Sequence, residues 1–334
     1  MTSAVSRLLP HFAVVVEMEN ATTVEWSAVG QTLAVLAEQI AQVQPPGSAR
    51  PLVLLAHPGH PSESNQLIQT TCRQVPQLAA AARLQAISVP RGRYYELKNG
   101  GIAAADADLV VLLDSDALPE PGWLAALLTP FDREETVIAS GHTYLGHDDL
   151  ISRLLAMVWV FPLRDHDDRA ADRRSLNANN CALRRDVLGE RPFPIDNGFK
   201  VGCTKLMRQL EAAGISLVRV PAYAEHAPLS GWRFLLWRAL VTGRDADRKF
   251  ADLRSRARTK RLLAAVRGWL KMECRVVRRI LAHWRHVQLP IWQLPLALGL
   301  GLAFYGLALC GQLLRACGLC NEQPEYIPAY AESH

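Results

Sequence analysis

Short apolar segments alternate with longer amphipathic segments over residues 1–230. Most of the apolar segments are β-branched or rich in leucine and end at polar or turn residues, which predicts strands. The predicted strands are Phe12–Val16, Leu52–Leu55, Leu84–Val89, Leu109–Leu113, Thr136–Ser140 and Ile215–Val220. The predicted helices are Thr22–Val43, Lys98–Ala107, Gly122–Leu128, Asp148–Val160 and Thr204–Ala213. This alternation predicts an α/β, Rossmann-like sandwich of three layers around a mostly parallel sheet, with ligands at the carboxyl ends of the strands.

The C-terminal part of the chain has a different pattern. No Asp, Glu, Lys or Arg stands in residues 286–314, and residues 291–314 are mostly apolar. As a helix, these 24 residues would be about 36 Å long, which exceeds the ~30 Å hydrocarbon core of a bilayer. We therefore expect a membrane segment within 287–316. A buried core helix is the alternative, and Pro290 and Pro295 leave a re-entrant or interfacial helix open.

The net charge of +5 hides an asymmetry along the chain. Residues 244–286 carry a local net charge of +10, whereas the rest carries −5. The chain is therefore not a uniformly basic nucleic-acid binder, and we expect no nucleic-acid partner. Residues 261–284 interleave Arg and Lys with Leu, Val and Trp, as an amphipathic helix on an anionic membrane surface does. A solvated helix face is the alternative.

The strongest candidate chemistry lies at the end of the strand Leu109–Leu113. The strand is followed by Asp114-Ser115-Asp116, which places two carboxylates at one strand end. Carboxylate oxygens suit a hard divalent cation such as Mg²⁺ or Mn²⁺, which in turn binds a substrate diphosphate. An Asp-x-Asp sequence by itself is also common in solvated turns, so its position after a buried strand carries the interpretation.

With this Asp-x-Asp sequence, residues 10–230 resemble the family-2 glycosyltransferases with the GT-A fold. Phe12–Asn20 stands where the family has its first strand and nucleotide loop, and Lys98–Gly101 stands where it often has Ala-Arg-Asn-x-Gly. Asn179–Arg185 looks like the Asn-x-Ala-x-Arg-Arg segment that faces the donor sugar. Ile215–His226 is similar to the strand whose terminal His completes the metal site. The motifs follow the family's order and spacing.

The resemblance implies a nucleotide-sugar site and a metal site. A divalent cation, Mn²⁺ or Mg²⁺, would be held by Asp114, Asp116 and His226, with Asp114 on the ribose or on the water shell of the metal. Lys98 and Asn99 would lie near the diphosphate or the uracil of a donor, for which a UDP-sugar is favoured. The residues implied to contact the donor are Glu17, Glu19, Asn20, Lys98, Asn99, Asp114, Asn180 and Arg184.

Two positions depart from the family pattern. Gly202-Cys203 stands where the family has Glu-Asp, whose Asp is the general base, and the second strand ends in His57 where the family has Asp for the nucleobase. Asp196 is the nearest candidate for a replacement base, although it also suits a turn. Glu17 and Glu19 are further candidates. An acceptor that is already an anion, such as a lipid phosphate, would need little base, and lost catalysis is a third explanation.

These observations predict a membrane-associated glycosyltransferase. Residues 1–230 would form the GT-A-like domain, 231–286 a basic amphipathic helical collar, 287–316 the membrane segment and 317–334 a polar tail. The enzyme would transfer a sugar, by inversion, to a lipid-linked or glycan acceptor at the cytoplasmic membrane. The scattered, odd number of cysteines and the basic collar favour a domain that faces the cytoplasm. A noncatalytic GT-A-like binding module is the alternative.

Overall fold

A computed structural model describes residues 11–19, 21, 26–159, 161–164, 176–195, 201–227, 231–249 and 258–317. These residues form two compact units. The first unit contains the described residues of 11–143, 176–195 and 203–227, and the second contains those of 144–164, 201–202 and 231–317. Two hydrophobic core clusters lie in the first unit and one lies in the second.

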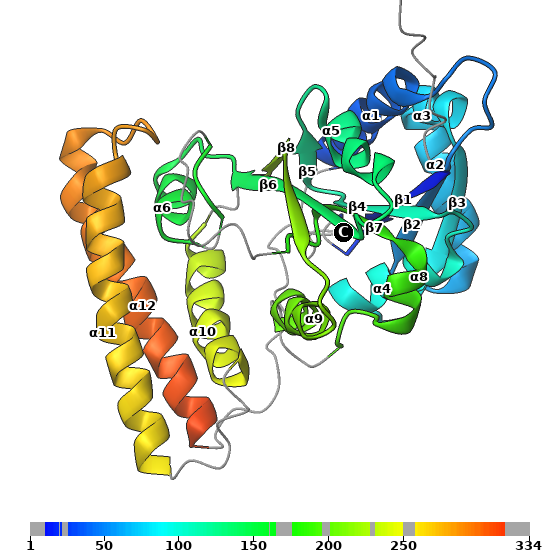
Figure 1. The fold of residues 1–334 in the computed structure, drawn as a ribbon. Helices are drawn as coiled ribbons and strands as arrows, with labels where there is room; N and C mark the ends of the chain where they lie inside the picture. Colours follow the sequence, from blue (N-terminus) through cyan, green and yellow to red (C-terminus); the bar gives the residue numbers. More distant parts are fainter. Residues whose placement is uncertain are drawn as a thin grey trace, which may run out of the picture. The chain divides into compact units, whose positions relative to one another are not determined.

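Among the described residues, the first unit is built on an eight-stranded sheet with the order β3-β2-β1-β4-β7-β6-β8-β5 (Figure 1). β1 lies between β2 and β4 and pairs in parallel with both, and β2 pairs in parallel with β3. The strands are β1 (Phe12–Glu17), β2 (Leu52–His57), β3 (Arg83–Ser88), β4 (Leu109–Asp114), β5 (Ala117–Pro119), β6 (Ile138–Leu145), β7 (Asn180–Arg184) and β8 (Leu217–His226).

The sheet is mixed, where the sequence predicted a mostly parallel one. β7 pairs antiparallel with β4 and with β6, and β5 pairs antiparallel with β8. β5 and β7 were not predicted because they are only three and five residues long, and β7 begins with an asparagine and ends with an arginine. The predicted strand Ile215–Val220 is longer in the structure and reaches His226.

Helices cover both faces of the sheet, which confirms the expected three layers. Alternate residues of β1 point to opposite faces: Val14 and Val16 join one core cluster, and Ala13 and Val15 join the other. Because β1, β2 and β4 are buried along their whole length, they are continuous apolar runs. The first core includes α1 (Trp26–Val43), α3 (Pro76–Ala81) and α5 (Trp123–Leu128), and the second includes α4 (Tyr94–Ala104), α8 (Arg185–Glu190) and α9 (Val201–Ala212). An additional helix, α2 (Ser64–Gln74), precedes α3.

Helix α4 packs unusually close to the central strand β1. A side chain at Gly101 would overlap Val15, so only glycine lets the two backbones approach to this distance. The helix begins at Tyr94, one turn before the predicted start, because the N–H of Arg93 donates to Glu96 Oε2 at 2.8 Å. This start places Lys98 inside the helix and directs it toward the end of the sheet.

We expect Gly101→Ala to lower the free energy of unfolding by about 1–3 kcal/mol, because the added methyl group forces α4 away from β1. Gly189→Ala is the matched control, since Gly189 lies in helix α8 and has open space around it. The control should be neutral or stabilising. Thermal or urea unfolding of the two variants measures the difference, and equal stability of both would contradict the close packing.

The second unit is helical. α12 (Leu294–Ala316) packs against α10 (Trp232–Lys249), α11 (Arg258–His283) and α6 (Leu150–Val158). A side chain at Gly243 of α10 would overlap the backbone of Ala308, so α10 and α12 touch backbone to backbone. The hydroxyl of Tyr305 in α12 donates to the carbonyl of Val158 at 2.7 Å and is buried.

One helix in the described residues, Ile291–Arg315, is long and apolar enough to cross a membrane, and a third of its most apolar stretch is buried. It coincides with the predicted membrane segment. Length and composition alone also suit the core helix of a soluble protein, so spanning stays a prediction.

Candidate metal site

The carboxyl ends of β1 and β4 carry two acidic residues side by side. In the register of these parallel strands, Glu17 is the partner of Asp114. The N–H of Ser115 then donates to the carbonyl of Glu17 at 3.0 Å, which holds the chain close as it leaves the strand. The two side chains are buried, so their charges interact through a medium of low dielectric constant.

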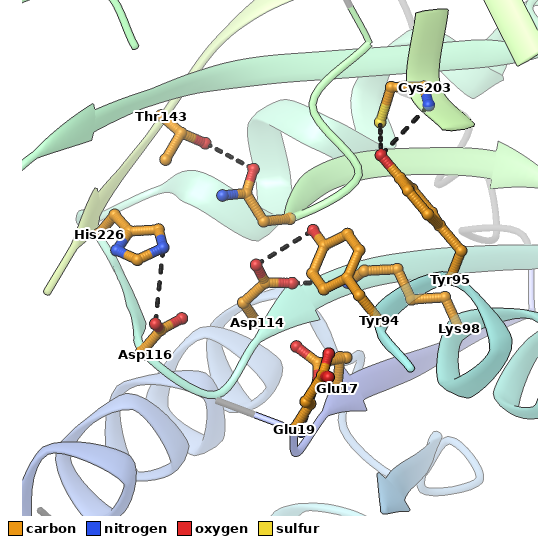
Figure 2. A network of polar contacts seen from close by, with 11 residues as sticks. Glu17, Glu19, Tyr94, Tyr95, Lys98, Asp114, Asp116, Thr143, Cys203 and His226 are labelled. Atoms are coloured by element: carbon orange, nitrogen blue, oxygen red, sulfur yellow. Dashed lines mark hydrogen bonds and ion pairs between the residues drawn. The ribbon is translucent and has the colours of Figure 1, made fainter. Parts of the chain in front are cut away.

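The next turn brings a third carboxylate and a histidine to the same edge. Ala117 pairs with His226 between β5 and β8, and the N–H of Ala227 donates to the carbonyl of Asp116 at 2.8 Å. As a result, ligand atoms of Asp114, Asp116 and His226 all lie within 4.8 Å of one another, and all three residues are buried (Figure 2). The structure therefore brings together the three residues for which metal ligation was expected.

The histidine is oriented as a metal ligand. Its Nδ1 lies 3.1 Å from the carbonyl oxygen of Ala227. Because a carbonyl only accepts, Nδ1 carries the proton in the neutral ring, and Nε2 keeps its lone pair. Nε2 of His226 faces Oδ2 of Asp116 at 3.5 Å. Two lone pairs that face each other require a cation or a proton between them, so this donor set fits a divalent cation.

Asp114 is held differently, by two donors from helix α4. Nζ of Lys98 contacts its Oδ1 at 2.6 Å, and the hydroxyl of Tyr94 donates to its Oδ2 at 3.1 Å (Figure 2). Lys98 is fully buried, and its ammonium lies 4.6 Å from the centre of the Tyr94 ring. Each oxygen of Asp114 accepts one hydrogen bond and keeps a further lone pair, so Asp114 would still be able to hold a cation together with Asp116 and His226.

Two further carboxyl groups lie beside this ion pair. Burial and the adjacent Asp114 raise the pKa of Glu17 well above its usual value, although Lys98 opposes the shift. One Glu17 oxygen accepts the backbone N–H of Glu19. Burial also raises the pKa of Glu19 to about 7, while a hydrogen bond from the backbone of Tyr94 opposes the shift. Both groups therefore hold protons at a pH at which exposed glutamates are ionised.

Three residues expected at the donor have other partners in the structure. The side-chain amide of Asn99 donates to the carbonyl of Phe193 at 2.8 Å and accepts from the N–H of Phe193 at 3.0 Å. The Asn180 amide accepts from the indole of Trp123 and donates to two backbone carbonyls. Arg184 pairs with Leu109 at the opposite end of β4 from Asp114, donates to the carbonyl of Thr136 and lines a cavity of about 570 Å³. Arg184 therefore lies away from the metal site, and its contact with a donor stays a prediction.

The position at which the family has its catalytic base is occupied by Cys203, which is half-buried. The N–H of Cys203 donates to the hydroxyl of Tyr95 at 3.2 Å, and that hydroxyl donates to Sγ at 3.3 Å (Figure 2). Burial raises the pKa of Cys203. The thiol therefore stays protonated and does not replace a carboxylate base. The other candidate base, Asp196, and the expected nucleotide contact Asn20 lie outside the described residues.

Tyr94 was not found from the sequence. Tyr94 and Lys98 are four residues apart and therefore lie on one face of a helix, but the predicted helix began only at Lys98. A helix start at the Arg93–Glu96 capping box would have shown the pair.

Residues 78–191 match the model of the family Glycosyl transferase family 2. The matched segment contains β4, Asp114 and Asp116. With this match, and with a GT-A-like fold, the protein is a glycosyltransferase. No curated protein matches the chain in sequence.

The fold is similar to that of a solved mannosyltransferase. The mannosyltransferase PcManGT from Pyrobaculum calidifontis, in complex with GDP-Man and Mn²⁺, has a TM-score of 0.55 and 13% identity, and the match covers 92% of this chain and 88% of that one. S. aureus TarS 1-349, in complex with UDP-GlcNAc, has a TM-score of 0.46 and 12% identity, with 92% of both chains covered. At such low identities the likeness concerns the fold.

We expect Lys98→Met to destabilise the protein by about 3–5 kcal/mol, because it leaves Asp114 buried, charged and next to Glu17. The double variant Lys98→Met/Asp114→Asn removes both charges and should recover much of the loss. Thermal unfolding of the two variants without divalent cations measures this. A double variant no more stable than the single one would contradict an ion-pair role.

We expect a pH-dependent stability that Glu19→Gln reduces. The pKa of Glu19 is about 7 in the fold and about 4.3 in the unfolded chain, so between these values the folded state binds more protons. The free energy of unfolding should therefore fall as the pH rises from about 5 to 8. Thermal unfolding across this range, with the exposed Glu38→Gln as control, measures the difference. Identical slopes for all three proteins would contradict the buried-acid interpretation.

Proposed function

We propose that this glycosyltransferase transfers a sugar from a nucleoside-diphosphate donor to a lipid-linked or glycan acceptor, with inversion at the anomeric carbon of the sugar. The observation that carries the proposal is the grouping of Asp114, Asp116 and His226, whose ligand atoms all lie within 4.8 Å of one another at the carboxyl edge of the sheet. Cleavage of the donor leaves a nucleoside diphosphate on which negative charge grows. A divalent cation, Mn²⁺ or Mg²⁺, supplies Lewis-acid stabilisation of that charge when bound.

The chain's own residues prepare this edge for an anionic donor. Lys98 neutralises Asp114, and the raised pKa values of Glu17 and Glu19 keep protons on two further carboxyl groups. Five acidic or metal-binding side chains therefore lie together, but their net negative charge is smaller than the number of their carboxyl groups would give. Glu17 and Glu19 lie at the end of β1, where the nucleotide is proposed to bind, so they are weaker candidates for the base than an acidic residue near the acceptor.

The acceptor side has no carboxylate at positions 202 and 203. Asp196 remains the proposed base for a hydroxyl acceptor. An acceptor that is already an anion, such as a lipid phosphate, is the second possibility that fits, because the Cys203 thiol, whose pKa is raised, supplies no base. The presence of Gly202-Cys203 where the family has Glu-Asp favours one alternative function, a noncatalytic module that binds a nucleotide sugar.

A uridine nucleotide is the proposed donor, and a guanosine nucleotide is the competing one, since PcManGT is seen with GDP-Man. The proposed location is the cytoplasmic face of a membrane. The basic residues of 244–286 and the apolar helix Ile291–Arg315 support it.

We expect UDP or GDP to bind in a Mn²⁺-dependent manner, and we expect Asp116→Asn to weaken that binding at least tenfold, because it removes a charged oxygen beside His226. The exposed Asp132→Asn serves as control. Calorimetric titration of each protein with each nucleotide, with and without Mn²⁺, measures the effect.

The outcomes separate the candidate functions. Metal-dependent binding followed by release of the sugar to an acceptor supports the transferase. Metal-dependent binding with neither transfer nor hydrolysis of any nucleotide sugar supports the noncatalytic module. Equal affinity of the wild type and Asp116→Asn, or binding of neither nucleotide, would overturn the proposed site.

A further inference from the structure

Helix α11 of the second unit has three distinct faces. Successive residues of an α-helix are rotated by about 100°, so residues three or four apart share a face. Ala265, Val276 and Ile280 lie on one face and are buried within the unit. Together with Trp269 and Met272, which pack against the same core cluster, they form the face that holds α11 in the unit.

A second face, about 120° around the helix from the buried one, is apolar and exposed. Leu263 is 59% exposed, Val266 39%, Leu270 51% and Leu281 51%, and their spacing places them along one side of the helix. Burial of such side chains is favourable, so their alignment on one exposed face indicates a surface that is covered in use. The simple solvated helix face considered from the sequence does not fit this observation.

A basic face runs directly beside the apolar one. Arg267, Lys271 and Arg278 are exposed and follow the leucines around the helix by about 40–100°. An apolar stripe bordered by cations is complementary to a bilayer with anionic head groups, because the leucines enter the acyl boundary while the cations stay at the phosphates. A protein partner would not require this order of faces.

Helix α12 and the 3-10 turn Ile291–Gln293 that leads into it present an uncharged outer face. Trp292 of the turn is 74% exposed, and Leu296 and Leu302 of α12 are 50% and 40% exposed. Gly299 and Ala303 of α12 are exposed as well. This face suits contact with lipid, but it is only one side of the helix.

The other side of α12 is fixed to charged helices. Gly243 of α10 touches the backbone of Ala308, and Gly301 lies against Val276 and Ile280 of α11. α11 contains eight Lys and Arg residues, and Arg238 and Arg244 of α10 are buried in the unit. If α12 crossed a bilayer with this packing, it would carry these cations into the hydrocarbon, which is strongly unfavourable.

We propose that the second unit attaches to an anionic membrane as an interfacial anchor, with α11 and α12 in the plane of the surface and with α12 not spanning the bilayer. This deepens the membrane location proposed above, and it rests on that location but not on the transfer reaction. Nucleotide binding and vesicle binding can therefore fail independently.

The first experiment is flotation of the full chain with vesicles of phosphatidylcholine alone or mixed with phosphatidylglycerol. We expect binding to the anionic vesicles, reduced at least fivefold in Leu263→Gln/Leu270→Gln and in Arg267→Gln/Lys271→Gln. The matched controls in the first unit are Ile195→Gln, which is 57% exposed in the wild type, and Arg73→Gln/Arg83→Gln, which are exposed cations. The controls should bind like the wild type.

Equal binding of the wild type and both α11 variants would overturn the docking face. If the leucine variant instead changed the oligomeric state in light scattering while its vesicle binding stayed intact, the face would belong to a second copy of the chain. Thermal unfolding of each variant, compared with that of the wild type, verifies that the chain is folded.

The second experiment tests spanning with the wild-type protein. Cys274 of α11 and Cys317 at the end of α12 are both exposed thiols. In sealed vesicles, a membrane-impermeant maleimide followed by peptide mass spectrometry reports which of them faces the reagent. We expect the extent of labelling of each thiol to be the same before and after permeabilisation, because neither thiol lies on the far side of the bilayer. Labelling of Cys317 only after permeabilisation, with Cys274 labelled before it, would show that α12 spans and would overturn the proposal.

Discussion

The buried ion pair between Lys98 and Asp114 is the interaction on which the catalytic edge depends. Asp114, Glu17 and Asp116 all reach the same strand ends, where the surrounding side chains exclude water. The ionised carboxylates among them would repel one another without a compensating cation. A single ammonium, fully buried and in contact with a carboxylate oxygen at 2.6 Å, supplies that compensation from within the chain.

The position of this ammonium follows from backbone packing. Helix α4 approaches β1 because Gly101 has no side chain, and the helix starts early enough for Tyr94 and Lys98 to share the face above Asp114. The hydroxyl of Tyr94 occupies the second oxygen of Asp114. Asp114 is thereby fixed in orientation, while Asp116 and His226 face each other a few ångströms away. One edge of the sheet thus combines Asp114, whose charge Lys98 balances, with Asp116 and His226, whose side chains suit a cation.

The sequence was sufficient for the strands that place the acids, because buried parallel strands are apolar along their whole length. The grouping of Asp114, Asp116 and His226 followed from the family resemblance and is present in the structure. The roles of Asn180 and Arg184 were harder, because β7 runs antiparallel to β4. That direction places Asn180 near the acids within a network of backbone contacts and Arg184 at the far end. The pairing of Lys98 required the helix start, which depends on a side-chain cap rather than on hydrophobic spacing.

The backbone contact between α10 and α12 has a consequence for how the protein is divided. Gly243 and Gly311 bring the two helices together at positions where any side chain would overlap the partner's backbone. The apolar helix α12 is therefore an integral part of the packed core of its unit. Truncation at Pro290 would uncover Phe234, Val276 and Ile280, which are now buried. A chain shortened at this point would consequently expose apolar surface that α12 now covers.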